Sequence, residues 1–161
     1  MLTDYQIDND PYLRTYEDFI FNIKDFTHAQ KTVIVDEPLY VYTHRGDSLA
    51  NAYFKKNTSQ YIDNQIKRVQ VTQEAVKNES NTVKEWSTVH IIMYYNELLG
   101  KVALFPDYYP DKRIKIIFRF IRQNKDILNR HYSLCGFSKI GCLLILYMPH
   151  FLYMRYRKVK I

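Results

Sequence analysis

The stretch TYEDFIFNIKDFTHAQKTVIVDEPLYVY, residues 15–42, changes from a helical to a β-like pattern within a few turns of chain. Thr15 is a suitable helix N-cap, and apolar residues follow it at helical spacing: Phe19, Ile20, Ile23 and Phe26. After a polar break, the run TVIVD is rich in β-branched residues, and Pro38 fits a strand start or a sheet edge. This order predicts the end of an α/β layer in residues 1–50.

The rest of the chain, residues 51–161, has the apolar spacing of helices. One helix is predicted around Ile62, Ile66, Val69 and Val76, and a second is capped by Ser80 or Asn81 and runs through Trp86, Val89, Met93 and Leu98 towards Phe105. A proline-punctuated loop at 105–111 precedes a basic helix with Ile114, Ile117, Phe118 and Ile121 on its apolar face. We therefore expect a predominantly helical protein with an α/β segment at its N-terminus.

The composition excludes several common kinds of site. The 161 residues include only four glycines, and neither GxGxxG nor GxxxxGK[ST] occurs, which excludes the usual glycine-built nucleotide cradles. The two cysteines, Cys135 and Cys142, fall in one expected helix. A rise of about 1.5 Å per residue would put them about 10 Å apart, too far for a disulfide. A reducing cytoplasm is therefore the expected location, and no signal peptide is recognisable.

Charge is distributed very unevenly along the chain. Residues 1–50 hold four Lys/Arg and nine Asp/Glu, a net charge of −5, whereas residues 111–161 hold twelve and two, a net charge of +10. A basic tail of this kind could face anionic lipid, nucleic acid or an acidic partner. We expect no nucleic-acid partner, because the basic residues stand beside long aliphatic ones and no nucleic-acid-binding motif is present.

The tail itself, residues 134–161, combines an apolar run with aromatic and basic residues. The run from Ile140 to Pro149 is about half of the roughly 20 residues that a membrane-spanning helix needs. A helix lying in a membrane interface fits the mixture, and its candidate contacts are Tyr147, Phe151, Tyr153, Arg155, Arg157 and Lys158. A core helix with a solvated basic end fits the same pattern.

The acidic pair Glu17–Asp18 admits a structural and a catalytic interpretation. In the structural one, Thr15 and Asp18 form a capping box, and both acids are favoured by the positive end of the helix dipole. In the catalytic one, a carboxylate held at a helix N-terminus acts as a general base. The pair by itself favours the structural interpretation.

A longer ordered pattern surrounds this pair. In residues 7–50, the ED pair opens a helix, the step Phe21-Asn22 follows, and then come DEPLY-x-Y, Arg45 and Ser48. These 44 residues resemble the C-terminal part of the catalytic domain of family-2 glycosyltransferases. The resemblance implies a remnant of the nucleotide-sugar-binding GT-A fold in residues 1–50 and a helical extension in residues 51–161.

The resemblance also assigns roles to single residues. It implies that Asp18 is the general base of an inverting transfer and that Glu17 orients the acceptor. It places His44, Arg45 and Ser48 near the diphosphate of the donor, although His44 and Arg45 could equally form a solvated turn before Gly46. The remaining histidines, at 28, 90, 131 and 150, have no metal-ligand spacing.

Donor binding is expected to need more than this chain. The DND at 8–10 has the form of the family's Asp-x-Asp metal motif, but it stands in the wrong place, only eight residues before Asp18, and is interpreted as a turn. The half that binds the nucleotide would then be missing. The resemblance implies that a complete enzyme would use Mg²⁺ or Mn²⁺, but it assigns no metal to this chain. It also implies that the chain alone would have little activity.

Two functions therefore stand as hypotheses. The first is the C-terminal portion of a glycosyltransferase that moves a sugar from a nucleotide-sugar donor to a saccharide or lipid-linked acceptor, in surface polysaccharide synthesis. It would lie in the cytoplasm, on the inner face of the cell membrane. The alternative is a non-catalytic helical module that binds a membrane or a protein partner through its basic tail.

Overall fold

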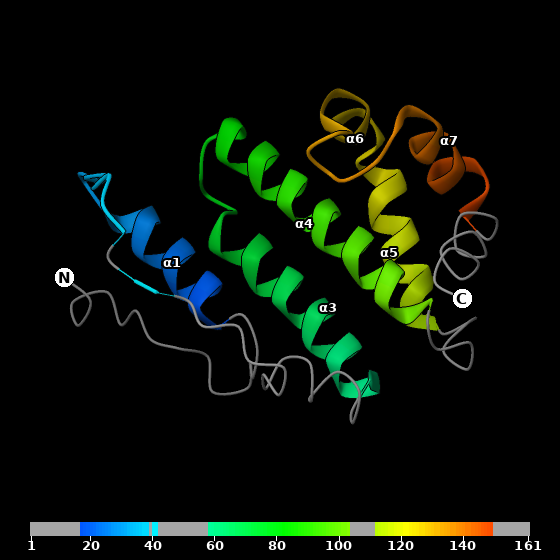
Figure 1. Cartoon of the computed structure of the whole chain (residues 1–161), viewed down its shortest axis with the longest axis horizontal. Coiled ribbons are helices and arrows are strands. Elements are labelled where there is room, and N and C mark those ends of the chain that lie inside the picture. The colour runs from blue at the N-terminus through cyan, green and yellow to red at the C-terminus, as the bar shows by residue number, and fades with distance from the viewer. Residues whose placement is uncertain (1–16, 39, 42–57, 104–111, 150–161) are drawn as a thin grey trace. The chain divides into compact units, whose positions relative to one another are not determined.

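The computed structural model describes residues 17–38, 40, 41, 58–103 and 112–149. These residues form helices joined by turns and irregular segments, and no strand occurs among them (Figure 1). The chain divides into two compact units, residues 1–78 and 79–161. The prediction of a mainly helical protein is confirmed for the part of the chain that the structure covers. The predicted boundary at residue 50 falls in a segment outside it.

The first unit contains helices α1, Glu17–His28, and α3, Thr58–Ala75, which pack against each other. Burial follows most of the predicted face. Ile62 and Val69 of α3 and Val76, directly after the helix, are nearly inaccessible, whereas Ile66 is half-buried. The same helix also buries polar side chains, which apolar spacing does not predict: Gln65, Arg68 and Thr72.

The segment that follows α1 differs from the expectation of strands. Residues 31–36 have no regular secondary structure, and the β-branched side chains of Val33 and Ile34 are 72% and 91% exposed. A strand needs hydrogen-bonding partners on at least one edge, and β-branched residues stabilise it chiefly by packing on a sheet face. No strand neighbours TVIVD in the part of the chain that the structure describes, and local propensity alone does not make it a strand. Phe26, expected on the buried face of α1, is also exposed.

The second unit consists of α4, Asn81–Val102, α5, Lys112–Gln123, α6, Lys125–His131, and α7, Lys139–Tyr147. Helices α5 and α6 each contact the other three helices, and in Figure 1 they lie between α4 and α7. The core of the unit is aliphatic, and its fully buried side chains include Ile92, Leu99, Ile114, Ile117, Ile121, Leu128 and Ile145. Tyr95 of α4 and Phe120 of α5 add an edge-to-face contact with ring centroids 5.5 Å apart.

Local signals at the helix ends agree with the sequence in this unit. Ser80 caps α4 as predicted, and its hydroxyl accepts a hydrogen bond from the Val83 amide at 3.3 Å. Ser138 caps α7 in the same way through the Gly141 amide at 3.0 Å. The two cysteines do not share one helix as expected, because a turn separates α6 from α7. Both are free thiols, in agreement with the prediction of no disulfide.

Candidate functional site

The acidic pair lies where the sequence predicts it, in the first turn of a helix. Helix α1 begins at Glu17, and Asp18 is its second residue. Carboxylates at these positions interact favourably with the positive end of the helix dipole. The side chains of this turn lie outside the described residues, as does Thr15. The structure therefore shows that the backbone of Glu17 and Asp18 forms the first turn of α1.

Most of the other predicted site residues fall in segments that the structure does not describe. This holds for the candidate diphosphate contacts His44, Arg45 and Ser48, and for the DND at 8–10. It also holds for five of the six candidate membrane contacts: Phe151, Tyr153, Arg155, Arg157 and Lys158. The sixth, Tyr147, is the last residue of α7 and is 74% exposed.

Helix α7 is apolar on both of its faces. Cys142, Ile145 and Leu146 point into the core of the second unit. The opposite face carries Ile140, Leu143 and Tyr147, at spacings of three and four residues, and all three side chains are more than half exposed. Met148, directly after the helix, is exposed as well. We call Ile140, Leu143, Tyr147 and Met148 the α7 apolar face.

Helix α5 carries a row of cations next to this helix. Lys115, Arg119 and Arg122 are spaced by four and three residues, which places them along one side of the helix, and all three are exposed. They line a hollow of about 520 Å³ together with Phe118, Gln123 and Pro149. Arg122 donates from Nε to the carbonyl oxygen of Leu146 at 3.0 Å, which ties the row to the last turn of α7. We call Lys115, Arg119 and Arg122 the α5 basic row.

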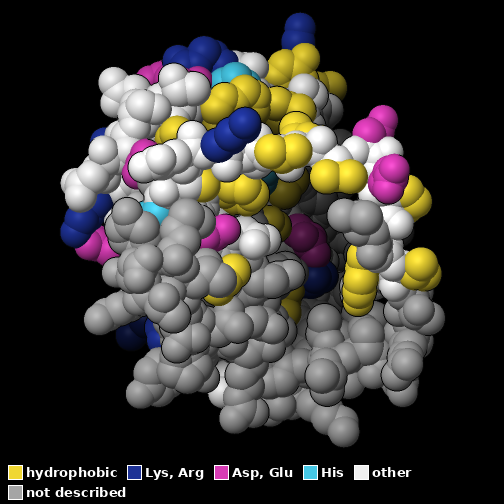
Figure 2. All heavy atoms as spheres, turned by 90° about the vertical axis from the view of Figure 1, so that its left-hand side faces the viewer, with side chains coloured by type: hydrophobic (Ala, Val, Ile, Leu, Met, Phe, Trp, Pro, Cys, Tyr) yellow, Lys and Arg dark blue, Asp and Glu magenta, His cyan; other side chains and the backbone are white. Residues whose placement is uncertain are grey.

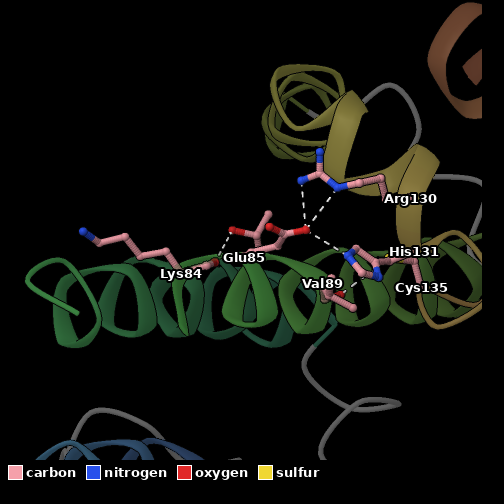
Figure 3. Close-up of polar contacts among 7 residues, drawn as sticks. Lys84, Glu85, Val89, Arg130, His131 and Cys135 are labelled. Atoms are coloured by element: carbon pink, nitrogen blue, oxygen red, sulfur yellow. Dashed lines mark hydrogen bonds and ion pairs between the residues drawn. The ribbon is translucent and has the colours of Figure 1, made fainter. Parts of the chain in front are cut away.

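A second polar cluster joins α6 to α4. Figure 3 shows Arg130 and His131 converging on Glu85. One carboxylate oxygen of Glu85 accepts hydrogen bonds from Nε and Nη2 of Arg130, at 3.1 and 2.8 Å, and from Nε2 of His131, at 2.9 Å. The His131 ring also packs against Trp86, with centroids 5.2 Å apart. These hydrogen bonds, His131 first, hold the pKa of Glu85 below its ordinary value.

This cluster has the form of a structural tie. One oxygen of its carboxylate accepts hydrogen bonds from two basic side chains of the neighbouring helix, which joins α6 to α4. Among the residues that the structure covers, no three His, Cys, Asp or Glu side chains are grouped as metal ligands. These described residues therefore offer no carboxylate set that fits Mg²⁺ or Mn²⁺.

The α7 apolar face and the α5 basic row form the site that the described residues support best. The sequence indicated the aliphatic run and the basic helix separately. It could not show that Arg122 of the row reaches the last turn of α7, because this contact depends on the packing of α5 against α7. Within the described ranges, no helix is both long enough and apolar enough to cross a membrane.

Comparison with known proteins identifies no relative. No protein-family model matches the chain, and neither a curated protein nor a solved structure shows significant similarity to it. Function therefore has to be proposed from the residues and their geometry.

Proposed function

We propose that the chain is the C-terminal portion of an inverting glycosyltransferase that acts with a donor-binding half. The observation that carries the proposal is the ordered pattern in residues 7–50, in which the acidic pair Glu17–Asp18 stands at the start of a helix. Its substrates would be a nucleotide sugar and a saccharide or lipid-linked acceptor, as in surface polysaccharide synthesis. In a complete enzyme, Mg²⁺ or Mn²⁺ would accompany the donor.

The exposed apolar side chains of the first unit support this proposal. Phe26, Val33, Ile34 and Val35 are each more than half exposed. The β-branched run among them has the composition of a strand that packs in a sheet. A remnant of a GT-A domain would expose these side chains, because the layer against which they pack belongs to the other half. Hydrophobic side chains are visible among charged ones on the face drawn in Figure 2.

The proposed chemistry needs one proton acceptor. The acceptor hydroxyl loses its proton as its oxygen attacks the anomeric carbon, and the nucleoside diphosphate leaves from the opposite side. Asp18 would take this proton, and Glu17 would orient the acceptor. His44, Arg45 and Ser48 would contact the diphosphate, where a cation stabilises the developing negative charge.

The substitution Asp18→Asn tests the proposal in the chain completed by the donor-binding half of a transferase. Loss of a general base is expected to lower turnover by roughly 10²–10⁴-fold while donor binding persists. Asp126→Asn is a matched control, because Asp126 is likewise the second residue of a helix, α6. Full activity of Asp18→Asn would disprove its assignment as the base.

The chain alone supplies a second test, by calorimetric titration with uridine or guanosine diphosphate and Mn²⁺. The proposal expects no binding at micromolar concentrations. Micromolar affinity would show that a working donor site exists in this chain and would contradict the need for another half.

The α7 apolar face favours a second function, the binding of a membrane surface. A helix with apolar residues on all sides is most stable when all of them are removed from water. One side of α7 is already buried in the core of the second unit. Its other side could lie in the interface of a bilayer, with the basic residues of the tail near the headgroups. This function is compatible with the first, since a lipid-linked acceptor also resides at the membrane.

Point substitutions test this second function better than removal of residues 134–161. That segment contributes Phe137 and Ile145 to the core, so its removal would also unfold the unit. Ile140→Ser/Leu143→Ser should weaken binding to lipid vesicles, measured by co-sedimentation, by at least about tenfold. Each serine lacks the apolar side chain whose burial in the bilayer would favour binding. Val33→Ser/Ile34→Ser removes equally exposed apolar side chains elsewhere and should leave binding unchanged. Equal binding by both variants would exclude α7 as the contact.

A further inference from the structure

The α5 basic row lies in the most one-sidedly charged part of the described chain. Residues 112–149 contain eight Lys/Arg and a single acid, Asp126, a net charge of +7 from eight minus one. Asp126 belongs to α6, and helix α5 itself contains no acid. The cations of the row are therefore not matched by acids on their own helix, and their field attracts anions.

The shape of this region adds a place for an anion to bind. The hollow of about 520 Å³ takes Lys115, Arg119 and Arg122 from α5 and Pro149 from beyond the end of α7. Phe118 also lines it and is itself only 8% exposed. Guanidinium groups bind phosphate oxygens through two parallel N–H donors, and Lys adds a point charge.

The neighbouring helix indicates which phosphate-bearing molecule fits. Arg122 is bonded to the Leu146 carbonyl in the last turn of α7, and the exposed Tyr147 and Met148 follow directly. The cations thus adjoin exposed apolar side chains that lie outside the hollow. A ligand that offers phosphates beside hydrocarbon satisfies both features, and the surface of a phospholipid bilayer is such a ligand.

We propose that the hollow between α5 and the end of α7 binds phosphodiester headgroups of an anionic lipid bilayer, while the α7 apolar face enters the adjoining acyl region. This inference rests on the proposed membrane binding and extends it, because it assigns lipid selectivity to three residues of α5. Neutral bilayers would bind chiefly through α7, because the choline of each phosphatidylcholine headgroup balances the charge of its phosphate.

Single-stranded nucleic acid fits the same row less well. Its bases bind by stacking on exposed aromatic rings, whereas the aromatic ring in the hollow, Phe118, is buried. On the α7 apolar face one exposed side chain, Tyr147, is aromatic, and the other three are aliphatic: Ile140, Leu143 and Met148. Aliphatic side chains favour acyl chains over bases.

The test measures binding of the intact chain to vesicles of phosphatidylcholine with and without phosphatidylglycerol. Lys115→Gln/Arg119→Gln removes two cations and keeps Arg122, whose hydrogen bond to α7 supports the fold. Lys31→Gln/Lys77→Gln is the matched control, because it lowers the net charge equally at two exposed lysines of the first unit. A melting curve of each variant verifies that it is folded.

The wild type should bind anionic vesicles more tightly, and salt should weaken this preference by screening. The row variant should lose roughly fivefold per cation, about 1 kcal/mol each near an anionic surface, and the control variant much less. Its binding to neutral vesicles should not change. Equal loss in both variants, or none in the row variant, would overturn the inference and leave membrane binding through α7 intact.

Two further arms separate the lipid from other sources of phosphate. Inorganic phosphate at millimolar concentration should compete only weakly, and a single-stranded oligonucleotide should bind more weakly than anionic vesicles. Tighter binding of either one would overturn the assignment to lipid. If the wild type binds no vesicle of either composition, both the membrane function and the inference are wrong. If it does bind, Ile140→Ser/Leu143→Ser tests the membrane function of α7 separately from the lipid selectivity of the α5 basic row.

Discussion

The carboxylate of Glu85 in α4 lies 2.9 Å from Nε2 of His131, the last residue of α6. An ionised carboxylate can only accept hydrogen bonds, so His131 donates from Nε2. Arg130 donates to the same oxygen. This single acid therefore receives two basic side chains from consecutive positions, and it fixes the short helix α6 on the long helix α4.

Loss of this acid should weaken the packing of α6. Glu85→Gln removes the charge that Arg130 and His131 share, whereas Glu97→Gln interrupts only an ion pair with Lys101 within α4. Pairs within one helix contribute little to stability. Thermal unfolding should show a lower melting temperature for Glu85→Gln than for Glu97→Gln. Equal melting temperatures would mean that the cluster adds nothing to the docking of α6.

The same cluster predicts a dependence of stability on pH. Hydrogen bonds from His131 and Arg130 lower the pKa of Glu85 in the folded state below its ordinary 4.5. A lowered pKa stabilises the fold at a pH above the unfolded-state value, and this stabilisation is lost as the pH falls through the folded-state value. The stability difference between wild type and Glu85→Gln should be full at pH 7 and shrink below about pH 4.5. A difference independent of pH would contradict this origin.

Two glycines should respond to alanine with opposite signs. Gly136 has φ of +78° and ends the turn after α6, where the Phe137 amide donates to the Tyr132 carbonyl and the Gly136 amide to that of Ser133. An added Cβ would lie 2.8 Å from Nδ2 of Asn96, which donates to the Gly136 carbonyl. Gly136→Ala should therefore cost about 1–2 kcal/mol.

Gly100→Ala is the matched substitution. Gly100 lies within α4, and an added Cβ would meet nothing within 4 Å. Alanine in a helix interior is favoured over glycine by about 0.5–1 kcal/mol, so this variant should be more stable than the wild type. Chemical denaturation of both variants measures the two effects. A stabilised Gly136→Ala variant would contradict the left-handed turn.

The cysteines should be nearly inert in the folded protein. Burial, and to a smaller extent the neighbouring Cys142, raises the pKa of the Cys135 thiol to about 11. Burial also raises the pKa of Cys142. At pH 8, roughly one Cys135 in a thousand would be the reactive thiolate. Iodoacetamide should label both residues slowly in buffer and rapidly in denaturant, as followed by mass spectrometry. Rapid native labelling of Cys135 would show that it is accessible.

The helices of the second unit could be predicted where a local signal was strong. Ser80 marks the start of α4 because a hydroxyl can cap the helix that follows it in sequence. The four residues predicted for the apolar face of α5 are all buried: Ile114, Ile117, Phe118 and Ile121. The break between α6 and α7 was missed, although a glycine between two helical patterns, Gly136, was a signal for it.

The candidate site could be predicted only in part. The sequence identified Tyr147 and the basic helix, and it left α7 between a membrane interface and a core helix. In the structure one side of α7 lies in the core, where Ile145 is buried, and the other side is exposed at Leu143. The hydrophobicity of a helical sequence does not indicate which side of an apolar helix becomes buried. That depends on where the other helices pack against it.

By itself, the sequence determined the mainly helical character of residues 58–103 and 112–149, the caps and the basic charge of α5, because these follow from residues close together in the chain. Tertiary structure alone decided the features that need distant partners. Glu85 meets residues 45 and 46 positions away, Arg122 meets the end of α7, and TVIVD forms no strand where no neighbouring strand pairs with it among the described residues. Such contacts depend on which surfaces pack together, and local pattern does not encode that choice.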